Sequence, residues 1–172
     1  MGIKPILIEP NKLLRHVSKP VEKVTKNEKK LMDDMLDTMY AANGIGLAAI
    51  QIGIPLRIIV IDISKDPDKK EPRFFVNPII KNKNSIKVTY EEGCLSVPNQ
   101  FAEIERPNEC EIEYLDYNGE KNFLKAEGLL ATCIQHEMDH LEGILFIDYL
   151  SKLKKSMIIK KLSKNKSARI VV

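Results

Sequence analysis

The residues whose types and spacing could do chemistry begin with HEMDH at positions 136–140. In a helix, positions i and i+4 lie on one face, so His136 and His140 can direct imidazole nitrogens at a single metal ion. Glu137 is then placed to take a proton from a bound water. Two histidines that merely pack or meet solvent are the alternative, but two of only three histidines in the chain have this spacing. The pattern favours a catalytic metal site.

A third ligand is required, because catalytic sites usually have three protein ligands and one position open to water. Two common arrangements are excluded. Phe146 stands where an extended metalloprotease motif needs a histidine, and no acidic residue follows Asp148. The third ligand must therefore lie upstream of the motif.

Three of the remaining cysteine and histidine residues are poor candidates for the third ligand. Cys110 lies on the apolar face of an alternating segment, where core packing explains it. Cys133 is seven residues from His140, or about 10.5 Å along a helix axis, so it is expected to line the site. His16 has no partner ligand nearby.

Cys94 is the preferred third ligand. It follows Gly93 in EEGCLSVP, which we expect to be irregular, with backbone able to approach a ligand closely. The predicted site is Cys94, His136 and His140 plus water.

GIGLAA (44–49) matches the spacing of a dinucleotide-binding fingerprint, and Asp62 ends a strand downstream. That fingerprint requires a strand before its glycines and a helix after them. Here a helix precedes the glycines and a strand follows within ten residues. No nucleotide cofactor is expected.

The elements that must position these residues follow from periodicity. Thr25 and Glu28 have capping-box spacing before a helix with an apolar stripe, and Asn118-Gly119 is a hairpin signal. Strands are predicted at 57–62, 73–80 and 109–117, a further strand is expected to run from about residue 85 into the irregular stretch around Cys94, and further helices are predicted at 127–142 and 151–164. The order predicts an α+β fold: antiparallel β-sheets packed around a central metal-binding HExxH helix, with an N-terminal helix and a C-terminal helix.

Composition suits one soluble domain: 172 residues, 44% hydrophobic and 30% charged. Residues 1–150 carry 19 Lys+Arg against 24 Asp+Glu, a net −5, whereas residues 151–172 carry eight Lys+Arg and no acid. We expect a single catalytic domain over 1–150 and a basic C-terminal helix or tail over 151–172. No membrane span or leader is expected, and an odd number of cysteines favours a reducing compartment.

Three segments taken together resemble the signature motifs of the peptide deformylase family: GIGLAAIQ (44–51), EGCLS (92–96) and QHEMDH (135–140). The opening PNKLLRHVSKPV is also similar to that family. The resemblance extends over about residues 4 to 150.

The resemblance implies an enzyme that removes the formyl group, as formate, from the initiator formyl-methionine of nascent polypeptides. It implies attack by metal-bound hydroxide, with Fe(II) as the usual ion and zinc, nickel or cobalt as substitutes. Carried over by motif, the ligands are Cys94, His136 and His140, the general acid/base is Glu137, and the oxyanion is stabilised by Gln51 and the backbone N–H of Leu95.

The same carry-over gives the substrate-binding residues. Ile45, Gly46, Leu95 and Cys133 are expected around the methionine, and Gly46 and Gly93 are expected to offer backbone hydrogen bonds to an extended peptide.

Several positions depart from the family pattern. Tyr90 and Thr132 stand where aliphatic residues are expected, and Phe101 stands where many members carry Arg. Arg106 is the nearest basic residue that could substitute for that Arg.

Residues 151–172 suggest a further partner. Family members are thought to dock on the ribosome through the C-terminal helix, and a basic segment could neutralise RNA phosphates; a solvated helix end is the alternative. No transit peptide is evident, so the bacterial cytoplasm is favoured over an organelle. The rival functions are another metal-dependent amidohydrolase or aminopeptidase, and a non-catalytic ribosome- or RNA-binding protein.

Overall fold

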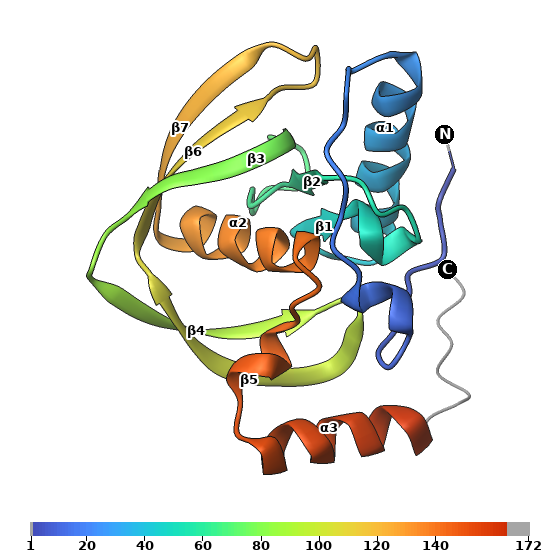
Figure 1. The fold of residues 1–172 in the computed structure, drawn as a ribbon, viewed down its shortest axis with the longest axis vertical. Helices are drawn as coiled ribbons and strands as arrows, with labels where there is room; N and C mark the ends of the chain where they lie inside the picture. Colours follow the sequence, from blue (N-terminus) through green and yellow to red (C-terminus); the bar gives the residue numbers. More distant parts are fainter. Residues whose placement is uncertain (1, 165–172) are drawn as a thin grey trace.

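The computed structural model describes residues 2–164, which form the helices and strands shown in Figure 1. The α-helices are α1 (Lys26–Ala41), α2 (Gly128–Leu141) and α3 (Lys152–Lys164), and the 3-10 helices are η1 (Lys12–Arg15), η2 (Ala49–Ile52) and η3 (Phe146–Tyr149). The strands are β1 (Gly46–Ala48), β2 (Ile58–Ile61), β3 (Arg73–Lys83), β4 (Lys87–Cys94), β5 (Val97–Pro107), β6 (Glu109–Leu115) and β7 (Lys121–Glu127).

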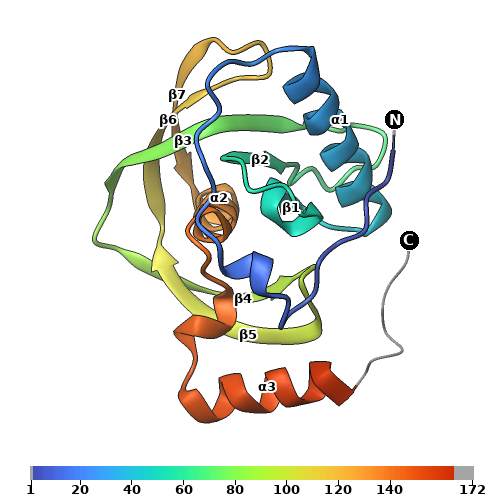
Figure 2. The ribbon, with the colours of Figure 1, turned by 45° about the vertical axis from the view of Figure 1, so that its right-hand side comes forward.

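The strands form two antiparallel sheets. One has five strands in the order β1-β2-β3-β6-β7, and the other is the pair β4-β5. Figure 2 shows α2 nearly end-on in the middle of the molecule, with strands of both sheets around it. The predicted α+β fold with antiparallel sheets around the HExxH helix is confirmed.

α2 is central, and most of its circumference is buried. Residues 131–137 are all buried, and Ala131 and Ile134 pack with Phe75 and Ile112 from the five-stranded sheet. His136, Glu137 and other polar side chains of α2 are buried as well, so the helix is enclosed on its polar side too. The two histidines of α2 are therefore held on a helix with little freedom to move.

α1 confirms the predicted N-terminal helix. The Thr25 side chain caps it, and Glu28 accepts a hydrogen bond from the Thr25 backbone at 2.8 Å. Met32, Met35 and Met39 are completely buried against Leu47 and other residues of β1 and β2. These methionines form the apolar stripe expected of this helix and are core residues.

The segment around Cys94 is more regular than expected. Glu91, Glu92 and Gly93 still pair in register with β5, as the end of a strand that begins with Lys87↔Pro107, but the register shifts between Gly93 and Cys94, so the expected irregularity is confined to that point. β5 itself was not predicted, since Pro98 and Pro107 interrupt its strand pattern. Cys94 is thus fixed at the end of a paired strand, just before the turn into β5.

α3 begins one residue later than predicted and packs on η3 and β5. Ile158 is buried, and Ile159 and Leu162 lie against the same apolar cluster as Val97 and Phe146. The predicted basic segment continues to residue 172, but Lys166 and Arg169 lie outside the described residues.

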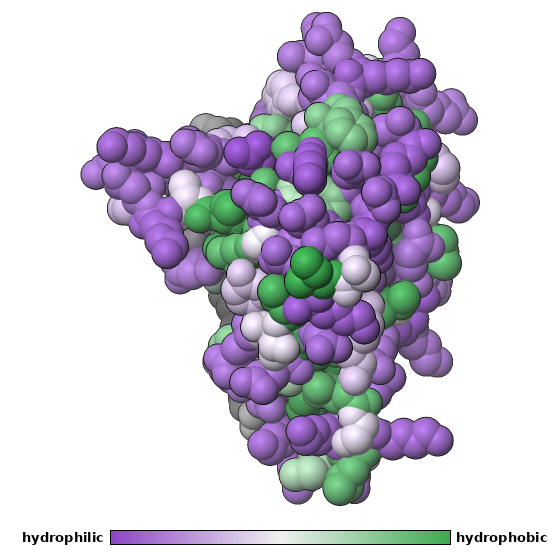
Figure 3. All heavy atoms as spheres, turned by 90° about the vertical axis from the view of Figure 1, so that its left-hand side faces the viewer, coloured by the Kyte–Doolittle hydropathy of each residue, from purple (hydrophilic) through white to green (hydrophobic). Residues whose placement is uncertain are grey.

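The surface is mainly hydrophilic on the face that lies at the left of Figure 1. Figure 3 shows that face, on which apolar residues are exposed in the central and lower parts. None of the helices in residues 2–164 is both long enough and apolar enough to span a membrane.

Candidate metal centre

The structure brings Cys94, His136 and His140 together, with their ligand atoms all within 4.8 Å of one another. The sulfur of Cys94 lies 3.3 Å from Nε2 of His140. Cys94 comes from the end of β4 and both histidines from the buried face of α2. One thiol and two imidazoles, converging and mostly shielded from solvent, fit a metal ion that keeps a fourth position for water.

Glu92 orients His136. Its Oε2 lies 2.9 Å from Nδ1 of His136, which leaves Nε2 as the nitrogen able to bind a metal. Glu92 is itself buried and held by Arg106, whose Nε donates to Oε1 at 2.6 Å. Arg106 also donates to Asp139 at 2.8 Å, so the ion-pair chain returns to α2.

Sequence reasoning did not select Glu92, although a signal was present. Side chains at i and i+2 of a strand share a face, so Glu92 and Cys94 had to point the same way once β4 was recognised as a strand. An acid in that position is the common partner of a metal-binding histidine.

The electrostatics of the site favour a neutral His140. Burial lowers the pKa of His140 well below its usual range, and the neighbouring His136 lowers it further. Burial opposes ionisation of Glu92, but hydrogen bonds from His136 and Arg106 outweigh it and hold the pKa of that carboxyl below its ordinary value. The result is a neutral imidazole available as a ligand and a charged carboxylate behind the other histidine.

Glu137 lies beside the three candidate ligands and is 4% exposed. Burial raises the pKa of Glu137 to about 7, and Oε2 has no hydrogen-bond partner among residues 2–164. Such a carboxyl can take up and release a proton near neutral pH. Gly46 makes room for it, because a Cβ at Gly46 would collide with the Glu137 carboxylate.

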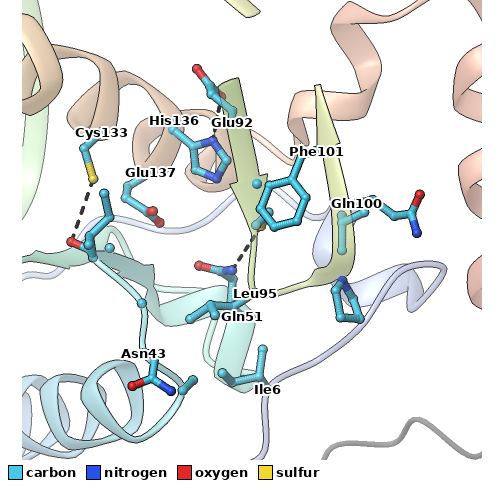
Figure 4. A pocket seen from close by; sticks show the side chains of 18 of the residues that line it. Ile6, Asn43, Gln51, Glu92, Leu95, Gln100, Phe101, Cys133, His136 and Glu137 are labelled. Carbon is cyan, nitrogen blue, oxygen red and sulfur yellow. Dashed lines mark hydrogen bonds and ion pairs between the residues drawn. The ribbon is translucent and has the colours of Figure 1, made fainter. Parts of the chain in front are cut away.

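Gln51 is oriented by the backbone. The N–H of Ala48 donates to Gln51 Oε1 at 2.8 Å, which turns the amide so that Nε2 lies 3.5 Å from Cys94 Sγ and 3.1 Å from Ser96 Oγ. Figure 4 shows Gln51 facing Glu137 and His136 across the site. An N–H donor is therefore held next to the candidate ligands.

A cavity of about 650 Å³ opens beside these groups. All six residues expected at the substrate-binding or oxyanion positions by resemblance line it: Ile45, Gly46, Gln51, Gly93, Leu95 and Cys133. Tyr90, Thr132 and Phe101, which depart from the family pattern, line it as well.

The prediction that Arg106 substitutes for the family's basic residue at the position of Phe101 is wrong. Arg106 does not replace a basic residue at the cavity mouth, because its side chain is buried and its guanidinium is committed to Glu92 and Asp139. It is absent from the cavity lining within the described part of the chain.

Two strands that border the cavity, β1 and β4, each have one edge that is not paired with another described strand. β1 is the outer strand of its sheet and pairs with β2, and β4 pairs with β5. Gly46 of β1 and residues 91–94 of β4 contribute to the lining. Unpaired edges facing one cavity can accept hydrogen bonds from, and donate them to, an extended chain.

Known proteins resemble this chain over nearly its whole length. The family model described as polypeptide deformylase matches residues 3–156. A peptide deformylase of Pelagibacter ubique is 80% identical over 172 residues, all of both chains, and one of Rhizobium meliloti is 52% identical over 169 residues, 98% of this chain and 97% of its own.

Solved structures are similar in the same way. The peptide deformylase of Ehrlichia chaffeensis in complex with actinonin superimposes with a TM-score of 0.93 at 43% identity, covering 96% of this chain and 99% of its own. A peptide deformylase from Legionella pneumophila gives a TM-score of 0.89 at 46% identity, covering 95% of each chain.

Proposed function

The chain belongs to the polypeptide deformylase family, and we propose that Cys94, His136 and His140 hold its catalytic metal ion. The protein is a metal-dependent enzyme that removes the formyl group from nascent peptides. The observation that carries the assignment of ligands is the convergence of three donor atoms within 4.8 Å beside a buried carboxyl.

Fe(II) is the ion proposed for this site, with zinc, nickel or cobalt able to replace it. Thiolate and imidazole donors suit all of these metals. When bound, such an ion lowers the pKa of water from about 15.7 toward 7 and so supplies a nucleophile at neutral pH.

Glu137 is proposed to move the proton. Its carboxylate takes the proton of the attacking water and delivers it to the departing amine as the formyl C–N bond breaks, leaving formate and a free amino terminus. The pKa of about 7 suits both transfers. Nε2 of Gln51 and the backbone N–H of Leu95 are proposed to donate to the formyl oxygen as it gains negative charge.

The substrate is proposed to enter as an extended chain between the edges of β1 and β4. Its backbone would pair with Gly46 and Gly93, and the methionine side chain would occupy the part of the cavity lined by Ile45, Leu95 and Cys133. The lack of a side chain at both glycines permits this close approach.

Formate release from formyl-Met-Ala by anaerobically prepared, iron-loaded protein tests the function. We expect stoichiometric formate and Met-Ala, with about one metal ion per chain. An aminopeptidase would instead release free methionine from Met-Ala, and a non-catalytic ribosome- or RNA-binding protein would yield no formate although metal is bound.

The cellular setting is proposed to be the bacterial cytoplasm, and residues 1–150 are proposed to form the catalytic domain.

The basic segment that follows, residues 151–172, is proposed to contact the ribosome. Lys155 is not free for this, because its Nζ lies 2.6 Å from Asp148 and fastens α3 to the body. Other lysines of α3 are exposed: Lys152, Lys154, Lys160, Lys161 and Lys164.

Reversing three of these charges should weaken ribosome binding. We expect Lys160→Glu/Lys161→Glu/Lys164→Glu to reduce affinity for ribosomes about tenfold and to flatten its salt dependence, because fewer phosphates are neutralised. Co-sedimentation at several salt concentrations measures both. Charge reversal is preferable to truncation, since removing α3 would also remove Ile158 from the core.

The control reverses three exposed lysines elsewhere: Lys23, Lys65 and Lys121. Equal weakening by both triple variants would show that only net charge matters and would remove α3 as the contact.

A further inference from the structure

Exposed apolar side chains gather at the cavity mouth. Ile45, Phe101 and Leu129 are 45%, 65% and 37% exposed, and all three line the cavity. Clustered apolar surface beside a cavity marks a place that receives an apolar group, unlike single exposed residues elsewhere. Ile45 already belongs to the proposed methionine pocket, but that pocket does not account for Phe101 and Leu129.

Phe101 reaches this position across a glycine. It is the cross-strand partner of Gly93, and a Cβ built on Gly93 would meet the Phe101 ring. The ring therefore lies over β4 on the face where Gly93 has no side chain, and extends from β5 to the cavity. Figure 4 shows the ring standing over the site on the side of Glu92 and Gln100.

The charges at the mouth have one sign. The cavity lining contains no Lys or Arg among the described residues, whereas it contains Glu91, Glu92 and Glu137. Glu92 is neutralised by Arg106, but Glu91 is exposed. An acidic side chain brought here would meet a carboxylate and an aromatic ring without a compensating cation.

We propose that Phe101 contacts the third residue of the formyl-methionyl peptide and selects apolar over acidic side chains there. This inference rests on the proposed function and on the extended course of the substrate along β4. Side chains of an extended chain alternate, so residues one and three face the same side while residue two points away. With the methionine in the pocket, the third side chain is directed at the rim formed by Phe101.

The test compares kcat/KM for formyl-Met-Ala-Leu and formyl-Met-Ala-Glu. We expect the wild-type enzyme to favour the Leu peptide about tenfold, in the range that one apolar contact supplies. Phe101→Arg should reverse the preference by raising the rate on the Glu peptide, a gain that damage to the fold cannot produce. Phe123→Arg is the matched control, because Phe123 is 58% exposed on β7, away from the cavity lining, and it should leave the ratio unchanged.

The outcomes separate the two proposals. Failure of the wild-type enzyme to release formate from formyl-Met-Ala would overturn the proposed function. Formate release from formyl-Met-Ala with equal rates on the Leu and Glu peptides would overturn this inference alone. So would a Leu-to-Glu ratio that Phe101→Arg leaves unchanged, or a preference that appears for formyl-Met-X-Ala instead of formyl-Met-Ala-X peptides.

Discussion

Replacing Glu137 by Gln is expected to lower kcat for formate release by about 10²–10⁴-fold while the metal remains bound. Gln has nearly the same shape as Glu, so it fits the space against Gly46, but its amide cannot accept and return the proton. No proposed ligand is altered. The measurement is kcat with formyl-Met-Ala, together with metal content after dialysis.

Stability provides a second readout for the same variant. Glu137 is buried, and Oε2 has no hydrogen-bond partner among residues 2–164. Burying a carboxylate without partners costs free energy, so the neutral amide should leave Tm unchanged or raise it. If activity is lost and the Tm is also lowered, the loss would be explained by damage to α2 and not by the absence of a proton-transfer group.

The control is Glu142→Gln, which removes one charge from the residue that follows α2. Glu142 is exposed and pairs with Arg57 at 2.5 Å, away from the cavity lining. Its kcat should stay within about twofold of wild type, as expected for a surface pair. Retention of more than a tenth of kcat by Glu137→Gln would contradict the proton-transfer role.

Local patterns predicted the parts of the site that lie close together in the chain. The i and i+4 spacing of His136 and His140 holds both on one face of α2, and the capping box of Thr25 and Glu28 begins α1 as expected. These features depend on helix geometry alone.

Pairings between distant segments were not predictable in the same way. The contact between Glu92 and His136 joins residues 44 apart, and Arg106 reaches Asp139 across 33 residues. Each depends on the register of β4 with β5 and on how that pair packs against α2. Register follows from the assembled sheet, so a sequence pattern locates such acids only after the strand is recognised.

Phe101 illustrates the same limit. Its departure from the family pattern was evident in the sequence, and Arg106 was the nearest basic residue available to compensate. The structure shows that an inward-facing strand position buries Arg106 in ion pairs, whereas Phe101 points into the cavity mouth. Side chains alternate between the two faces of β5, so Phe101 and Arg106 point to opposite sides. This could not be foreseen because β5 was not predicted.

Replacing His140 by Ala is expected to abolish both metal retention and activity. The variant removes one of three proposed ligands and leaves a position that water must fill, so we expect less than about a tenth of the wild-type metal content. Adding metal should raise the Tm of the wild-type protein but not that of the variant, because only a protein that binds the ion is stabilised by it. Metal analysis and thermal unfolding measure this without any assay of activity.

His16→Ala is the matched control, since His16 is exposed and lies at the end of η1 outside the cluster of donor atoms. It should retain full metal content. Cys94→Ser should resemble His140→Ala, because a serine hydroxyl is not ionised at neutral pH and cannot replace a thiolate ligand. Normal metal affinity in Cys94→Ser would remove Cys94 from the ligand set.

Glu92→Gln should fall between these variants and the wild type. The amide can still accept a hydrogen bond from His136, but it lacks the charge that strengthens the interaction, so we expect a loss of about 10–100-fold in metal affinity. Complete metal loss would mean that Glu92 is needed to build the site and does more than orient His136. An unchanged affinity would mean that packing against Phe146, whose ring stacks on His136 with centroids 6.2 Å apart, is enough to hold the imidazole in place.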